Sequence, residues 1–154
     1  MTLFSFPQQV NERAARVVAG VVALTLSLAL VLQLPWLVPP LALGFLLRLG
    51  WGPRFSPLAR VAMFSAARLW DVRPVTGAPK RFAQGIGALC TLCASALFAA
   101  GQDRIAWSLV GLVLLFATLE AALGFCMGCW TYARLQRIGL IPADTCTDCA
   151  PIKG

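Results

Sequence analysis

Four long apolar runs limit what this chain can fold into. They cover about residues 15–33, 37–50, 82–100 and 105–132, and 59% of the 154 residues are hydrophobic. A soluble domain is usually about 45–50% apolar, and a chain this short cannot bury so much apolar surface in a core that faces water. The sequence therefore predicts a single all-α domain in a membrane, built as a four-helix bundle with the lipid bilayer as its solvent.

The first two runs fit a bilayer to different degrees, since a spanning helix needs about 20 residues. The run at 15–33 has Arg13 and Arg16 at its start, as in a signal peptide. It is long for a signal peptide and a second run follows at once, so we interpret it as a retained anchor. The run at 37–50 is short and begins among prolines, which favours a tilted or kinked span or a helical hairpin with the first run.

The segment between the second and third runs is basic and contains a candidate surface helix. Ser56-Pro57 is typical of a helix start, and apolar residues recur at helical spacing from there to Trp70, with Arg60 and Arg68 among them. This pattern predicts a short amphipathic helix at the membrane interface. A plain basic loop is the alternative.

The cationic residues lie almost entirely on one side of the predicted spans. Twelve lysines and arginines fall on the side of the two termini and the loop at 48–81, and Arg104 stands alone on the other side. The positive-inside rule predicts that both termini lie in the cytoplasm, with residues 133–154 as a cytoplasmic tail. The net charge of +7 is then explained by membrane flanks, and no nucleic-acid partner is expected because no binding motif for one is present.

All six cysteines fall into Cys-x-x-Cys pairs, which are Cys90/Cys93, Cys126/Cys129 and Cys146/Cys149. Residues i and i+3 share a helix face, so the two sulfurs of a pair can form a disulfide or bind one soft metal ion. Stable structural disulfides are rare in the reducing cytosol, and intracellular pairs are more often catalytic or metal-binding. The alternative is that the cysteines are small buried hydrophobic residues.

The predicted spans place the pairs at different depths. Cys90/Cys93 fall near the middle of the third span, Cys126/Cys129 near the cytoplasmic end of the fourth, and Cys146/Cys149 in the tail. Together they predict a ladder of thiols from the cytosol to the membrane midplane. In a continuous helix over 105–132, Cys126 and Cys129 lie near a C-terminus, whose dipole disfavours a thiolate. Arg134 and Arg137 follow closely and oppose that effect.

Glu120 is the second unusual residue, because a carboxyl group within a membrane helix is costly and is by default a functional hypothesis. It can accept a proton from a thiol or bind a cation. The alternative is a structural carboxyl group paired with Gln84 or Arg48. The nearby Gly124-x-x-x-Gly128 favours close approach of another helix, although the same glycines can loosen the helix beside the cysteines.

Several stretches of the chain resemble a bacterial family of small membrane proteins known only as a domain of unknown function. The stretches are Gly52-Pro53-Arg54-Phe55-Ser56-Pro57-Leu58-Ala59-Arg60, Pro79-Lys80-Arg81-Phe82-Ala83 and Leu119-Glu120-Ala121-Ala122-Leu123-Gly124-Phe125-Cys126-Met127-Gly128-Cys129-Trp130. The Gly-Phe-Cys-x-Gly-Cys element is the most specific. The resemblance implies a four-helix domain of a bacterial cytoplasmic membrane, with Cys126, Cys129 and Glu120 as its site. The other two cysteine pairs look like additions to the family pattern, and the family carries no assigned activity.

Our first functional hypothesis is a membrane thiol protein that relays electrons by thiol–disulfide exchange, or sulfur as a persulfide. Cys126 and Cys129 are the exchanging pair and Glu120 assists them. The expected partner is a cytoplasmic thioredoxin-like or sulfurtransferase-like protein, and no cofactor is expected.

Two other classes of function stay open at this point. The chain can be a handler or transporter of soft metal ions such as copper or mercury. No cysteine faces the outer side, however, and the chain has three methionines and no histidine. It can also be a structural or partner subunit in which the cysteines are incidental. The metal ligands under the second hypothesis are the six cysteines, Cys90, Cys93, Cys126, Cys129, Cys146 and Cys149.

Overall fold

The computed structural model describes residues 9–52, 57–69, 71 and 73–142. Within these residues the fold is almost entirely helical. Its elements, in chain order, are β1 (Gln9–Asn11), α1 (Glu12–Val31), η1 (Pro35–Leu37), α2 (Val38–Trp51), α3 (Pro57–Leu69), β2 (Pro74–Thr76), α4 (Gly77–Ala99), α5 (Asp103–Leu123) and α6 (Met127–Arg137).

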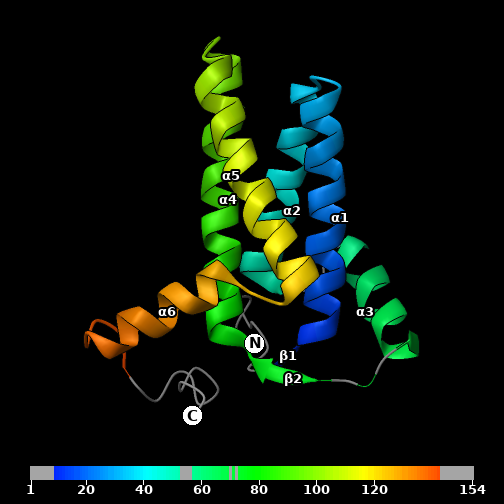
Figure 1. Ribbon diagram of the computed structural model, residues 1–154, viewed down its shortest axis with the longest axis vertical. Coiled ribbons are helices and arrows are strands. Elements are labelled where there is room, and N and C mark those ends of the chain that lie inside the picture. Colours follow the sequence, from blue (N-terminus) through cyan, green and yellow to red (C-terminus); the bar gives the residue numbers. More distant parts are fainter. Residues whose placement is uncertain (1–8, 53–56, 70, 72, 143–154) are drawn as a thin grey trace.

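Four of the helices stand side by side, and two shorter ones leave them at one end (Figure 1). α1 packs on α5, α2 packs on α4, and α4 also packs on α5. Helix α3 leans against α1, and α6 turns away from the lower end of α5 and contacts α4. The shared core is aliphatic and includes Val22 and Leu26 of α1, Val38 of α2 and Val110 of α5.

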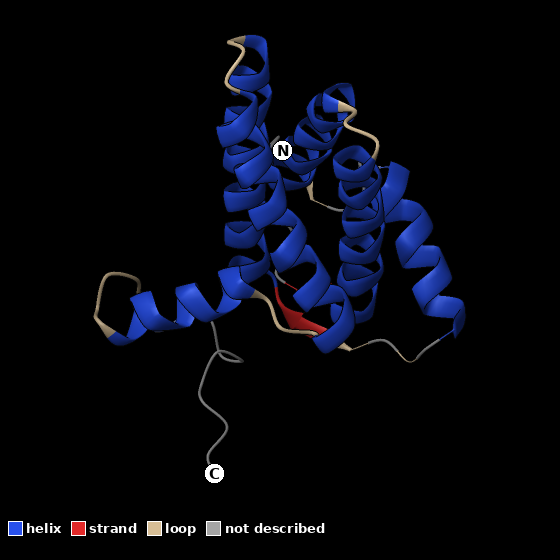
Figure 2. Ribbon diagram, turned by 45° about the horizontal axis from the view of Figure 1, so that its top comes forward, coloured by secondary structure: helices blue, strands red, loops and turns tan. Residues whose placement is uncertain are grey.

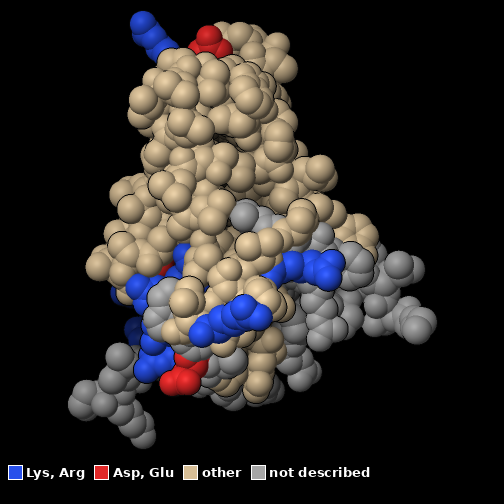
Figure 3. Space-filling view, turned by 90° about the vertical axis from the view of Figure 1, so that its right-hand side faces the viewer, with Lys and Arg blue, Asp and Glu red and all other residues tan. Residues whose placement is uncertain are grey.

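Three helices of the described chain are long and apolar enough to cross a membrane, namely α1, α4 and α5. Many of their large apolar side chains point outward, among them Leu24, Leu89 and Leu115. On the face in Figure 3, a broad uncharged band separates a charged lower end from the few charges at the top. The prediction of an all-α membrane protein is confirmed at this level.

The second apolar run forms a short helix. α2 has 14 residues, and at about 1.5 Å per residue it is roughly 21 Å long. This is less than the hydrocarbon core of about 30 Å. The third run forms a longer helix than predicted, because α4 begins at Gly77 and not at Phe82.

A small antiparallel sheet joins the starts of α1 and α4 (Figure 2, red). Val10 pairs with Val75, and the backbone N–H of Glu12 donates to the carbonyl of Arg73 at 2.9 Å. Asn11 caps α1, because its side-chain oxygen accepts from the N–H of Arg13 at 3.0 Å. The starts of α1 and α4 therefore lie together with the ends of α2 and α5, and we call this end of the bundle the charged end.

The predicted single helix over 105–132 is wrong, because the structure forms two helices there. α5 ends at Leu123, and Gly124 adopts a left-handed conformation with φ of +70°. The N–H of Gly124 donates to the carbonyl of Glu120 at 3.0 Å, and that of Phe125 donates to Leu119 at 3.3 Å. A glycine in this conformation is the usual end of a helix, because other residues strain there.

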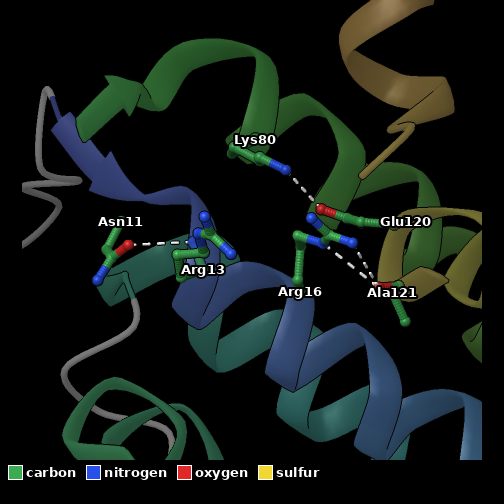
Figure 4. A network of polar contacts seen from close by, with 6 residues as sticks. All are labelled: Asn11, Arg13, Arg16, Lys80, Glu120 and Ala121. Carbon is green, nitrogen blue, oxygen red and sulfur yellow. Dashed lines mark hydrogen bonds and ion pairs between the residues drawn. The ribbon is translucent and has the colours of Figure 1, made fainter. Parts of the chain in front are cut away.

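An arginine from α1 completes the end of α5. Arg16 donates from Nε and Nη2 to the carbonyl of Ala121 at 3.3 and 3.2 Å (Figure 4). Its Nη2 also donates to the carbonyl of Ala122 at 2.8 Å. The last carbonyls of a helix have no partner within it and need one elsewhere. A cation at a helix C-terminus also complements the helix dipole. Arg16 therefore stabilises the break that separates α5 from α6.

Candidate functional site

The break places the second cysteine pair at the start of a helix. Cys126 is the extended residue before α6, with φ of −100° and ψ of 110°, and Cys129 lies in the first turn. The prediction that this pair lies near a helix C-terminus is therefore wrong. A helix N-terminus favours a thiolate, since the free backbone N–H groups carry partial positive charge. Cys126 is buried and Cys129 is half-buried, and both are free thiols.

Close packing holds the pair against α4. A Cβ atom on Gly128 would lie 2.4 Å from the Cβ of Ala83 and 2.5 Å from its Cα. Only a glycine lets α6 approach this closely. One turn farther along, the rings of Phe82 and Tyr132 meet edge to face with centroids 5.9 Å apart. The two glycines therefore have different roles. Gly124 ends helix α5, and Gly128 allows α6 to pack closely on α4.

An ion pair between a buried lysine and a half-buried glutamate lies beside the thiols. Lys80 Nζ in the first turn of α4 donates to Oε1 of Glu120 in the last turn of α5 at 2.5 Å (Figure 4). The exposed fractions of the two side chains are 10% and 17%. Glu120 thus binds neither of its two predicted partners, Gln84 and Arg48. Instead, Arg48 Nε donates to Gln84 Oε1 at 2.9 Å. Gln84 and Arg48 therefore pair with one another.

Lys80 was missed by the sequence reasoning. The apolar run predicts a helix that begins at Phe82, and Lys80 precedes it. With α4 beginning at Gly77, Lys80 and Gln84 share a helix face. One sequence feature does indicate that Lys80 matters, since this residue lies in one of the stretches that resemble the family.

The surroundings separate the pKa values of the two thiols. The pKa of Cys126 is lowered from its ordinary value, chiefly by a hydrogen bond from the Cys129 thiol, against burial and the Glu120 carboxylate. The Lys80 ammonium also lowers it. The pKa of Cys129 is raised, first by its hydrogen bond to Cys126 and next by burial. Cys126 therefore ionises first, and Cys129 keeps its proton.

A cavity of about 110 Å³ opens between α1, α2, α4 and α5 at the charged end of the bundle. Cys126, Glu120 and the Arg48–Gln84 pair line it. Cys90 lines it as well, higher along α4, whereas Cys93 is exposed. Ten residues separate Lys80 from Cys90, so the two differ in depth by roughly 15 Å at 1.5 Å per residue. Glu120, which pairs with Lys80, therefore lies nearer the charged end of the bundle than Cys90 does.

The structure brings together some of the predicted site residues and leaves others apart. Cys126, Cys129 and Glu120 lie at one site, and Cys90 lies on the far wall of the same cavity. Cys146 and Cys149 lie outside the described residues, so the ladder of three pairs stays a prediction. Over the described ranges, no group of three or more Cys, His, Asp or Glu side chains is arranged to hold a metal ion.

The fold and the site define a class, which is a helical membrane domain with a free thiol pair at the start of a helix beside a lysine–glutamate ion pair. The family model described as Domain of unknown function (DUF4395) matches residues 10–137, and the chain belongs to this family. The predicted resemblance to a family without assigned function is thereby confirmed. The match includes Lys80, Glu120, Cys126 and Cys129 and ends before Cys146. No curated protein and no solved structure matches the chain.

Proposed function

We propose that this protein is a membrane thiol protein that relays electrons, or sulfur as a persulfide, through Cys126 and Cys129. The observation that carries the proposal is the helix break at Gly124. It turns a cysteine pair within an apolar run into a pair at a helix N-terminus, where a thiolate is stabilised. A merely structural pair of cysteines needs neither the break nor the buried lysine beside it.

Thiol–disulfide exchange uses the two thiols in sequence. The Cys126 thiolate attacks one sulfur of a substrate disulfide, forms a mixed disulfide and releases the other substrate sulfur as a thiolate. The Cys129 thiol then loses its proton and attacks the Cys126 sulfur. This step releases the second substrate thiolate and leaves a Cys126–Cys129 disulfide. Two electrons have passed from the protein to the substrate, and the reverse sequence returns them.

Sulfur relay uses the same nucleophile. The Cys126 thiolate attacks the outer sulfur of a substrate persulfide, takes that sulfur as a Cys126 persulfide and releases the substrate thiolate. The next acceptor thiolate removes it by the same reaction. Glu120 and Lys80 assist both routes, because Lys80 stabilises the Cys126 thiolate and Glu120 is the described carboxylate close enough to raise the pKa of Cys129. We assign to Glu120 the acceptance of the Cys129 proton.

The proposal includes an orientation. The charged end faces the cytoplasm, with both termini there, in a bacterial inner membrane. α1, α4 and α5 cross the bilayer, α2 completes a four-helix bundle as a short fourth span, and α3 lies at the interface. In α3, Ala62 and Ala66 are buried while Val61 and Phe64 are exposed, and Arg68 covers the Phe64 ring at 4.6 Å. A cytoplasmic thioredoxin-like or sulfurtransferase-like protein then reaches Cys126 from its own compartment.

Trapping tests the proposal directly. In the Cys129→Ser variant, the second attack is blocked, so a mixed disulfide between Cys126 and a thioredoxin-like partner should accumulate. It is measured by non-reducing electrophoresis and mass mapping of the linked peptides. The matched control is Cys93→Ser, which removes an exposed cysteine of another pair and should trap nothing.

The same preparation separates the other functions. Soft-metal handling predicts stoichiometric protection of Cys126 and Cys129 by copper(I) or mercury(II) without any mixed disulfide or persulfide. A structural subunit predicts that neither product forms. Either result would overturn the relay.

A further inference from the structure

The cavity beside Cys126 is mostly apolar. Its walls come from Val22 of α1, Phe45 of α2 and Leu112 and Phe116 of α5, among others. A cavity of this kind needs about 10–15 Å³ to hold one water molecule. At about 110 Å³, this one has room for a small ring. An apolar cavity with a few placed polar groups is the usual form of a small-molecule site.

Arg48 supplies a hydrogen-bond donor without a partner. Its side chain lies in the last turn of α2, and the residue is 4% exposed. Nε is used by Gln84, and the guanidinium lies 4.7 Å from the centroid of the Phe45 ring. Nη2 is buried and is, among the described side chains, the one buried nitrogen or oxygen that has no hydrogen-bond partner. A buried cationic donor without an acceptor is costly, so the site is built for an acceptor.

The number of unpaired hydrogen-bond donors at the cavity limits which class of ligand can bind there. A sulfur oxyanion carries three or more acceptor oxygens and needs several donors to leave water. Here Lys80 is engaged by Glu120 and Nε by Gln84, while the remaining walls are largely apolar. A planar ring with a single carbonyl oxygen turned toward Arg48 matches one donor and apolar walls. In a membrane, the rings that accept two electrons and carry such a carbonyl are quinones.

We propose that this cavity binds the headgroup of a membrane quinone, with one carbonyl oxygen accepting from Arg48 Nη2 and the ring next to Cys126. The inference rests on the proposed function and names the acceptor of its electrons. As the quinone is reduced, negative charge develops on its oxygen, and a preorganised guanidinium stabilises that charge.

The electrons and protons of this reaction balance. The Cys126 thiolate adds to a carbon of the quinone ring, which forms a C–S bond and places negative charge on the carbonyl oxygen. The Cys129 thiol, deprotonated through Glu120, then attacks the Cys126 sulfur and breaks the C–S bond. The products are a Cys126–Cys129 disulfide and a hydroquinone that has gained two electrons and two protons.

Anaerobic titration tests the site with duroquinone, whose ring is fully substituted and resists permanent arylation. Reduced protein in lipid nanodiscs should form one duroquinol, measured by ultraviolet absorbance, for each Cys126–Cys129 disulfide, measured by mass-resolved thiol labelling. Arg48→Met removes the donor and should slow duroquinol formation by at least about tenfold, the effect of one lost charged hydrogen bond. Its reaction with a small soluble disulfide should stay within about twofold of the unmodified protein.

Two further variants test the quinone site independently, in case Arg48→Met folds poorly. Val113→Phe fills the cavity from α5 and should also slow the quinone reaction alone. Arg60→Met removes an exposed arginine from α3 and should change neither reaction.

Each outcome has one meaning. Exchange with disulfides but no duroquinol would overturn the quinone site and leave the relay standing. Loss of both reactions in the unmodified protein would overturn the relay itself. Protection of Cys126 by thiosulfate but not by duroquinone would replace the quinone with an oxyanion.

Discussion

Lys80 and Glu120 form one ion pair, yet they act on the Cys126 thiol with opposite sign. The Lys80 ammonium lowers the pKa of Cys126 and the Glu120 carboxylate raises it. Both act at close range in a buried site, where charges are screened less than in water. The hydrogen bond from Cys129 outweighs either of them. Three neighbours therefore set how much thiolate Cys126 carries at neutral pH.

Opposite shifts are expected from the two halves of the ion pair. Lys80→Met should raise the pKa of Cys126, and Glu120→Gln should lower it, because the carboxylate is lost and Lys80 is freed from it. Thiolate absorbance near 240 nm, followed against pH, measures both shifts. Arg104→Met, at the far end of α5, is the control and should leave the pKa of Cys126 unchanged. Shifts in the same direction for both variants would contradict this electrostatic account.

The order of alkylation follows from the two pKa values. Alkylation requires the thiolate, so its rate rises as pH passes the pKa of each thiol. Cys126 should reach half its maximal rate at a lower pH than an ordinary cysteine does, because its pKa is lowered. Cys129 should stay unmodified over that range, because its pKa is raised. Cys129→Ala removes the largest cause of the low pKa, so the Cys126 profile should move to higher pH. Iodoacetamide labelling with peptide mapping decides this, and equal rates for the two thiols would refute it.

At the scale of elements, two glycines four residues apart have different structural roles. Gly124 ends α5 through its positive φ, and Gly128 lets α6 lie directly on the backbone of α4. Together they turn the chain and fix the start of α6 beside Lys80. The site therefore depends on the angle between α5 and α6 as much as on its own side chains.

Substituting these glycines should disturb the site from a distance. Gly128→Ala meets Ala83 at once, and overpacking of this kind typically costs about 1–3 kcal/mol. Gly124→Ala forces a left-handed alanine and should cost roughly 1–2 kcal/mol. Both should lower the melting temperature and change the pKa of Cys126, because α6 shifts away from the Lys80 and Glu120 charges that act on this thiol. Gly111→Ala is the matched control, since Gly111 lies in α5 with nothing within 4 Å of an added Cβ. It should be neutral or slightly stabilising.

At the scale of the whole molecule, charges gather at the two ends of an apolar body. The small sheet of β1 and β2 ties the starts of α1 and α4 together, and Arg16 ties α1 to the end of α5. Most of the described cations therefore share the charged end with the thiol site. A site at this end meets a cytoplasmic partner only in the proposed orientation.

Introduced cysteines test that orientation. In a variant whose natural cysteines are serine, Gln102→Cys lies between α4 and α5, and Leu140→Cys lies just after α6. A maleimide that does not cross membranes should label position 102 in intact cells and position 140 only after permeabilisation. The reverse pattern would place the thiol site outside the cell and exclude a cytoplasmic partner.

The sequence by itself determined the class of the protein and most of its helices. The length of an apolar run can be compared with the thickness of a bilayer without reference to any other part of the chain. For this reason α1, α2 and α4 appear close to where they were predicted, and α3 follows from the Ser56-Pro57 start. The cysteine pair and Glu120 were also visible, because a carboxyl group and paired thiols are unusual in such a run.

Only the tertiary structure decided the chemistry of the site. Gly124 is compatible with a continuous helix or with a break. The structure forms the break, and Arg16 stabilises it by donating to the carbonyl of Ala121, 105 residues away in the chain. The partner of Glu120 depended on which face α4 turns toward α5, and Arg48 lost its access to water only once α2 packed on α4. Such contacts join segments far apart in sequence, and local patterns carry no information about which of them will meet.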